Sequence, residues 1–184
     1  YPYSVNEGLP RAGVYNLYED NYGFIWVATE GGGATVFDGT HFKTFDIADG
    51  LASDIVRCMS TDGKGRIWFG TNDNGISIHE QNHFININKK GGLPHNTVRS
   101  MVLAPDSDMW VGTFGGVAIL KGETVERTLT VDNGLPSNKV RCLIRTADEQ
   151  IWIGTDEGVA VCKNGEVVKV HNQGSGLPSN QVLC

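Results

Sequence analysis

Short segments in which apolar and polar residues alternate recur along the whole chain, and turns rich in Gly, Asp and Asn separate them. Residues 50–91 show the arrangement clearly, because their alternation predicts strands at 55–61, 66–70, 76–80 and 84–88. Short strands with a turn every 8–12 residues or so are typical of all-β proteins. No stretch keeps the spacing of an amphipathic helix. The pattern therefore predicts an all-β fold.

Two sequence markers repeat in phase with these strands. The first is Ile or Met, then Trp, two small or apolar residues and Thr, and it contains all four tryptophans of the chain: Trp26, Trp68, Trp110 and Trp152. The second is Gly-Leu-Pro (Gly-Leu-Ala in one case), with a valine at a fixed distance after it, and it begins at Gly8, Gly50, Gly92, Gly134 and Gly176. Both markers have a period of 42 residues. A period of roughly 20–50 residues indicates a solenoid or a propeller.

Four antiparallel strands per repeat correspond to one blade of a β-propeller. A β-solenoid is the alternative, but its coils are usually shorter and its strands parallel. We expect the tryptophans to be buried between blades, and glycines such as Gly70 to allow close approach beside them. We predict four full blades that form an arc of a larger propeller, with unpaired edges that favour a homo-oligomer. The expected units are a last strand at 1–7, blades at 8–49, 50–91, 92–133 and 134–175, and the start of a further blade at 176–184.

Composition narrows the possible functions. The net charge is −6, and the 15 Lys and Arg residues are scattered, so we expect no nucleic-acid partner. No nucleotide-binding or nucleophile motif occurs, and we expect neither a cofactor nor a catalytic residue in this chain. His79 and His83 are four residues apart without an evident third ligand, so we expect no metal site either.

Strand alternation divides the connections between two faces of the predicted disc. The Gly-Leu-Pro loops share one face, the Gly-Leu-Pro face, with the turns after each Trp-x-x-Thr, and this face carries the more varied side chains. Three arginines directly follow marker valines and begin innermost strands at one depth, namely Arg57, Arg99 and Arg141. Their guanidinium groups are suited to carboxylates, as on an acidic sugar, although pairing with neighbouring loop groups is the alternative.

The other candidate ligand-binding residues lie on the same face. Tyr15 replaces arginine in the first blade, and Phe114 lies in a loop, so both rings are candidates for stacking on a sugar. Loop polar groups complete the set, although those in the Gly-Leu-Pro loops are also suited to hydrogen bonds within their own loops. These further candidates are Asp54, Asn96, Asn138, Asn72, Asp73 and Asp156.

The combined pattern resembles the two-component regulator propeller repeat. The third unit carries it from Gly92-Leu93-Pro94 through Val98 to Met109-Trp110-Val111-Gly112-Thr113. Ala104 and Thr146 depart from it, because they replace the turn aspartates found at Asp20 and Asp62. The match covers nearly the whole chain.

The resemblance implies a sensor region, outside the cytoplasmic membrane and thus periplasmic, of a bacterial regulator that is often a hybrid histidine kinase. Several members of the family respond to glycan breakdown products, so it implies an oligosaccharide or other small ligand. Contact with a membrane would come only through segments outside this chain. A protein-interaction scaffold is the first alternative, and a propeller lyase or glycosidase is the second.

Overall fold

The computed structural model describes residues 8–11 and 13–183, and within them it contains four sheets of four antiparallel strands. The first sheet comprises β1 (Val14–Glu19), β2 (Ile25–Thr29), β3 (Ala34–Phe37) and β4 (Phe42–Phe45). The second comprises β5 (Val56–Thr61), β6 (Ile67–Thr71), β7 (Ile76–Glu80) and β8 (His83–Ile87). The third comprises β9 (Val98–Leu103), β10 (Met109–Thr113), β11 (Gly116–Lys121) and β12 (Thr124–Leu129). The fourth comprises β13 (Val140–Arg145), β14 (Ile151–Thr155), β15 (Gly158–Lys163) and β16 (Glu166–His171).

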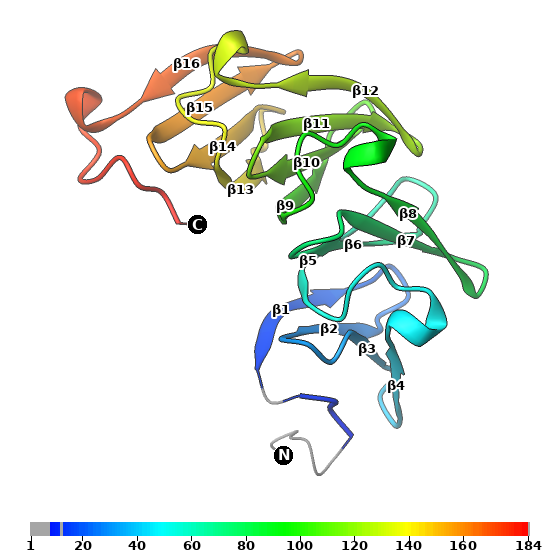
Figure 1. The fold of residues 1–184 in the computed structure, drawn as a ribbon. Helices are drawn as coiled ribbons and strands as arrows, with labels where there is room; N and C mark the ends of the chain where they lie inside the picture. Colours follow the sequence, from blue (N-terminus) through cyan, green and yellow to red (C-terminus); the bar gives the residue numbers. More distant parts are fainter. Residues whose placement is uncertain (1–7, 12, 184) are drawn as a thin grey trace.

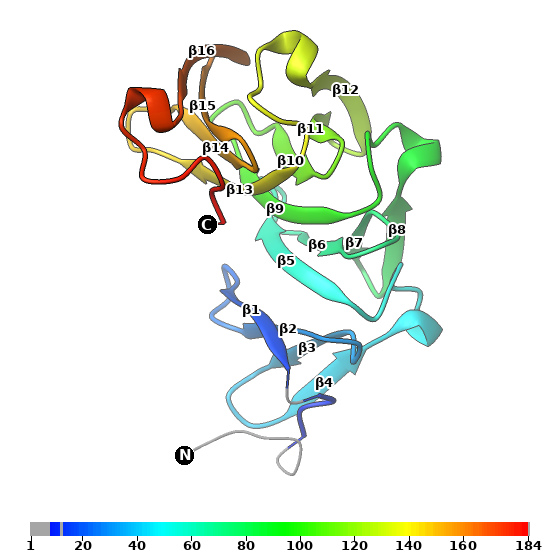
Figure 2. The same ribbon diagram turned by 60° about the vertical axis from the view of Figure 1, so that its left-hand side comes forward.

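The four sheets are propeller blades arranged as an open arc (Figures 1 and 2). Strands follow chain order in every sheet, and the first strands β1, β5, β9 and β13 pack side by side along the inner edge. The ribbon does not close into a ring (Figure 1). Both the propeller fold and the open arc predicted from the repeat are therefore confirmed, whereas association between arcs stays a prediction.

Three of the four tryptophans are buried between blades, as expected, and Trp152 is the exception. Trp26 contacts Phe69 of the second sheet edge-on, with ring centroids 5.4 Å apart. Trp68 lies in one apolar cluster with residues of the third sheet, and Trp110 in another with residues of the fourth. Trp152 is less buried than these three and stacks on His171 of its own sheet, because no further sheet follows in the described residues. Each blade thus completes its core with the blade that comes after it.

Glycine beside the tryptophan is required by the contact between blades. A Cβ built on Gly70 would overlap Cys58 Sγ and lie 2.6 Å from a methyl carbon of Val98, the marker valine of the next blade. Gly112 meets Val140 in the same way, at 2.7 Å. The close approach expected from the sequence is confirmed.

A short 3₁₀ helix precedes each marker Gly-Leu-Pro from the second one onward: η2 (Ile47–Asp49), η3 (Lys89–Gly91), η4 (Val131–Asn133) and η5 (Gln173–Ser175). Each ends at the marker glycine, which adopts a left-handed conformation; Gly92, for example, has φ 102°. The leucine that follows is buried in the second, third and fourth blades. The loops are thus rigid, capped elements that hold the next strand at a fixed depth.

The two ends of the chain do not add a described strand to the four sheets. The strand expected within 1–7 lies outside the described residues. The segment 176–184 was expected to start a further blade, but the structure assigns no strand in its described part, residues 176–183. Val182 donates one backbone hydrogen bond to Thr155 O at 3.0 Å, and its side chain lies over Gly154. Val182 therefore occupies the place of a marker valine, but the residues around it do not form a continuous ladder of hydrogen bonds with the neighbouring strand.

Candidate functional site

The inner strands place three arginines at one level near the axis of the arc. Arg57, Arg99 and Arg141 each follow a fully buried valine, and because side chains alternate along a strand they point away from the packed interior. All three are half-buried. We call them the axial arginine cluster.

In three of the four blades the residue at this level is held by the residue that directly follows the threonine of Trp-x-x-Thr. Arg57 Nε donates to Asn72 Oδ1 at 3.1 Å. Arg141 forms a two-pronged pair with Asp156, from Nε at 2.6 Å and from Nη2 at 3.1 Å. In the first blade Tyr15 hydrogen-bonds Glu30. An inner side chain and its own turn are thus linked on the Gly-Leu-Pro face.

The third blade breaks this rule. Its position after the threonine is Phe114, which has no hydrogen-bond acceptor in its side chain. Arg99 lies over that ring at 5.9 Å, and its Nε is buried without a hydrogen-bond partner within the described residues. Arg99 is therefore a guanidinium without a compensating acid, between two other guanidiniums.

The electrostatics of the cluster follow from these contacts. Burial lowers the pKa of Arg99, and the charges of Arg57 and Arg141 lower it further. The hydrogen bond to Asp156 raises the pKa of Arg141, and the same bond lowers the pKa of Asp156. The hydrogen bond to Glu30 raises the pKa of Tyr15, so its hydroxyl is protonated at neutral pH. An anion beside Arg99 would relieve the repulsion among like charges.

Two aromatic rings lie against the guanidinium groups of the axial arginine cluster. The Arg57 guanidinium is 3.9 Å from the centre of the Tyr15 ring, and that of Arg141 is 4.9 Å from the centre of Phe114. These contacts hold the guanidinium planes in fixed orientations. The structure therefore brings together six of the predicted site residues, namely Tyr15, Arg57, Asn72, Phe114, Arg141 and Asp156, around Arg99.

The loop candidates have a structural role. Oxygens of Asp54, Asn96 and Asn138 each accept the backbone N–H of the residue seven positions earlier, at 2.8–2.9 Å, and so close the 3₁₀ loop. These contacts are the hydrogen bonds within the loop that the sequence left open as the alternative. Asp73 is exposed in the adjacent turn. None of these four side chains contacts the axial arginine cluster through a hydrogen bond that the described structure contains.

Glu30 bonds to Tyr15 beside the axial arginine cluster, and it is not among the candidate residues identified from the sequence. It occupies the same repeat position as Asn72, Phe114 and Asp156, and that shared position is the signal by which a comparison of the four units finds it. On metals, no group of three or more His, Cys, Asp or Glu side chains in the described chain is arranged to hold an ion.

Comparison with known proteins identifies the repeat. The pattern of the two component regulator propeller family matches residues 8–31, 50–73, 92–115 and 134–157, which make up more than half of the chain. No curated protein matches the chain.

Solved structures with the same fold include extracellular domains of proteins described as one component or hybrid two component systems, and a lyase. One is the extracellular domain of a B. thetaiotaomicron protein described as a one component system, with TM-score 0.77 and 18% identity over 96% of this chain and 25% of that one. Another is the extracellular domain of a protein described as a hybrid two component system from the same organism, with TM-score 0.54 and 22% identity over 92% and 29%. Virginiamycin B lyase from Staphylococcus aureus aligns with TM-score 0.72 and 13% identity over 90% and 56%.

The present chain spans about a quarter of the length of the first of these proteins, and at such identities the likeness shows the fold alone. The four matches of the repeat pattern carry the family assignment, and each covers the first two strands of one sheet. The chain belongs to the two component regulator propeller family.

Proposed function

We propose that this chain is part of the sensing region of a bacterial two-component receptor, located outside the cytoplasm in the periplasm. It binds a small anionic ligand, such as an acidic product of glycan breakdown, at the axial arginine cluster. Binding is passed to an output domain, of the histidine kinase type, outside this chain. The family assignment supports the proposal, as does the likeness to extracellular domains of signalling proteins. Within the described residues no helix is long and apolar enough to span a bilayer.

The observation that carries the proposal is the state of Arg99. A buried guanidinium nitrogen without a partner costs free energy, because desolvation of a charged group is not repaid. A carboxylate repays it with charge-assisted hydrogen bonds to the guanidinium. Tyr15 and Phe114 flank the cluster and provide apolar ring surface for the body of a ligand. The cluster therefore fits an acidic sugar better than a neutral one.

Ligand binding suits this surface better than hydrolysis or elimination. Two carboxylates lie beside the axial arginine cluster, and both have partners: Glu30 is bonded to Tyr15, and Asp156 to Arg141. The Asp156 carboxylate has a lowered pKa because of its bond to Arg141, which is the opposite of what a general acid needs at neutral pH.

The test is calorimetric titration of the protein with glucuronate, and with glucose as the neutral match. We expect glucuronate to bind in preference to glucose, and Arg99→Gln to weaken glucuronate binding by about tenfold or more, or about 1.4 kcal/mol. The matched control is Arg145→Gln, which removes one guanidinium at the far end of the same set of inner strands. It should leave the affinity within about twofold at moderate salt.

Equal affinity for glucose and glucuronate, or equal effects of the two arginine variants, would refute an anion site at Arg99. Melting temperatures of both variants separate loss of binding from loss of folding. Arg99→Lys serves as a second variant, because it keeps the charge and loses the planar fork.

A further inference from the structure

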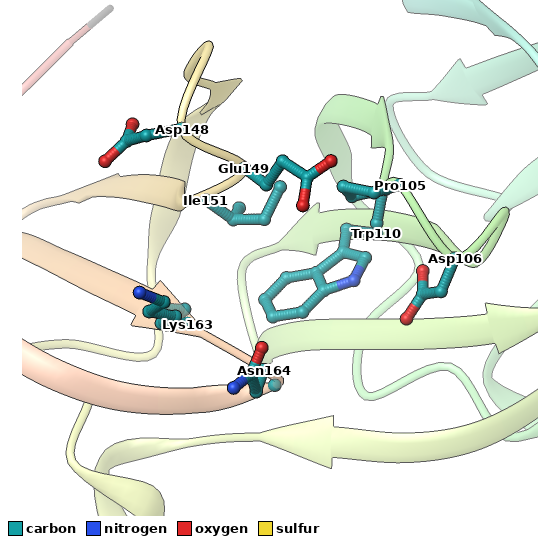
Figure 3. A pocket seen from close by; sticks show the side chains of 11 residues that line it. Pro105, Asp106, Trp110, Asp148, Glu149, Ile151, Lys163 and Asn164 are labelled. Atoms are coloured by element: carbon teal, nitrogen blue, oxygen red, sulfur yellow. The ribbon is translucent and has the colours of Figure 1, made fainter.

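A pocket lies on the face opposite the Gly-Leu-Pro loops, between the third and fourth sheets. It is a cavity of about 280 Å³ around Trp110, and we call it the Trp110 pocket (Figure 3). Turn residues on both sides form its rim, whereas Trp110, Ile151 and Cys162 form its inner wall. Burial raises the pKa of the Cys162 thiol to about 11, so this wall is uncharged at neutral pH.

The equivalent indoles of the first two blades are bound by a turn aspartate. Trp26 Nε1 donates to Asp20 Oδ2 at 2.9 Å, and Trp68 Nε1 donates to Asp62 Oδ2 at 3.0 Å. The same aspartates accept two backbone N–H groups of their own turn. In these blades the indole and the turn form one closed unit.

The third blade has Ala104 at this position, and Ala104 offers no side-chain acceptor. Trp110 is only 4% exposed, yet its indole N–H has no hydrogen-bond partner among the residues that the structure describes. Figure 3 shows the ring nitrogen turned toward the Asp106 side of the pocket. This nitrogen is not fully enclosed, so the indole N–H opens into the Trp110 pocket and is available to an acceptor that enters it, either water or a ligand.

The rim of the pocket is predominantly acidic. Asp106, Asp148 and Glu149 line it, and Lys163 is the single basic residue among its lining residues. Figure 3 shows Glu149 above the indole, and Lys163 on the side of the indole opposite Asp106. The excess of carboxylates favours a cationic group, whereas the indole N–H requires an oxygen or nitrogen with a free lone pair.

We propose that the Trp110 pocket binds a small organic amine that also carries a hydroxyl or carbonyl oxygen. The ammonium group is held by the rim carboxylates, and the oxygen accepts the Trp110 indole N–H. A volume of about 280 Å³ lies at the small end of ligand pockets, which suits a compound of the size of an amino alcohol or an amino sugar. This site is independent of the axial arginine cluster, because the two lie on opposite faces.

Two pairs of probe compounds, compared by calorimetric titration, test separately whether the ligand needs the oxygen and whether it needs the positive charge. Ethanolamine against propylamine tests the oxygen, since both carry the charge. Glucosamine against glucose tests the charge, since both carry hydroxyls. We expect the unaltered protein to bind ethanolamine at least about threefold more tightly than propylamine, and glucosamine more tightly than glucose.

Variants of the pocket then assign the contacts. Ala104→Asn restores an uncharged acceptor to the indole, and should bring ethanolamine down to the affinity of propylamine. Glu149→Gln removes a rim charge and should weaken both amines, whereas Glu157→Gln, the same change in the same blade on the Gly-Leu-Pro face, should weaken neither. Arg99→Gln should leave amine binding unchanged. The amine site and the proposed sensing site can therefore be refuted independently of each other.

The proposal is overturned if no amine binds, if glucose binds as well as glucosamine, or if propylamine equals ethanolamine in the unaltered protein. Equal effects of Glu149→Gln and Glu157→Gln also contradict it. Melting temperatures show whether Ala104→Asn folds. Should it not, the comparison of probes on the unaltered protein and the two glutamate variants decides the matter.

Discussion

At the scale of single residues, the first two blades each contain a turn aspartate that accepts hydrogen bonds from several donors at once. Asp62 accepts the Trp68 indole N–H, two backbone N–H groups and Arg66 Nε, the last at 2.8 Å. Arg66 also reaches Glu80 and Glu123, so the turn is tied to the next blade. The sequence identified this aspartate as a turn residue only, because its bond to an indole six positions away depends on the packing of two strands.

This aspartate makes stability depend on pH. Burial alone would raise the pKa of Asp62, but hydrogen bonds from Trp68 and Arg66 outweigh that effect and lower it. A carboxyl whose pKa is lower in the folded state stabilises the fold at neutral pH, and this contribution is lost as the pH falls from about 4 through the folded-state pKa. Asp62→Ala should therefore destabilise the protein by roughly 1–3 kcal/mol at pH 7, and the difference should shrink below about pH 4.

Urea unfolding of both proteins across this pH range measures the effect, with Asp73→Ala as the control at an exposed turn. A difference between Asp62→Ala and the unaltered protein that stays constant down to the lowest pH would show that the aspartate acts without its charge.

At the scale of elements, the period of the sequence placed the strands to within one or two residues. The expected strand at 55–61 is β5 (Val56–Thr61), and that at 76–80 is β7 (Ile76–Glu80). The short 3₁₀ helices were not predicted, because three residues are too few to show a helical period. The close contact between blades was predictable, since only Gly or Ala occupies the position two residues after each tryptophan.

That contact gives a prediction for packing. Gly70→Ala forces a methyl group against Cys58 and Val98, and should destabilise the fold by about 1–3 kcal/mol, the usual cost of overpacking a core. Gly63→Ala is the matched control, because its Cβ would meet only ordinary contacts of 3.6 Å or more. Chemical denaturation of both variants measures the costs. Equal stability of the two would show that the blades can separate slightly without loss.

At the scale of the whole molecule, the third blade departs from the first two on both faces, whereas the fourth departs from them on one, where Thr146 replaces the turn aspartate. Phe114 replaces an acceptor on the Gly-Leu-Pro face and leaves Arg99 Nε without a partner in the described structure, whereas Ala104 replaces the aspartate that binds the indole in the first two blades. The sequence indicated both replacements, but not their consequence, because the partners come together only when the strands of a blade are paired. Both proposed ligand sites therefore lie where the third blade lacks an acceptor that the first two blades have.

The most direct test of the sensing site restores the missing acceptor. Phe114→Asp gives Arg99 the kind of partner that Asp156 gives Arg141, and the account predicts a melting temperature at least as high as before, with glucuronate affinity lowered by about tenfold or more. Asn72→Asp is the control, because it places the same new charge beside Arg57, which is already paired, and should lower the affinity less. Glucuronate affinity that is unchanged in Phe114→Asp would contradict the claim that the unpaired Arg99 is the centre of a ligand site.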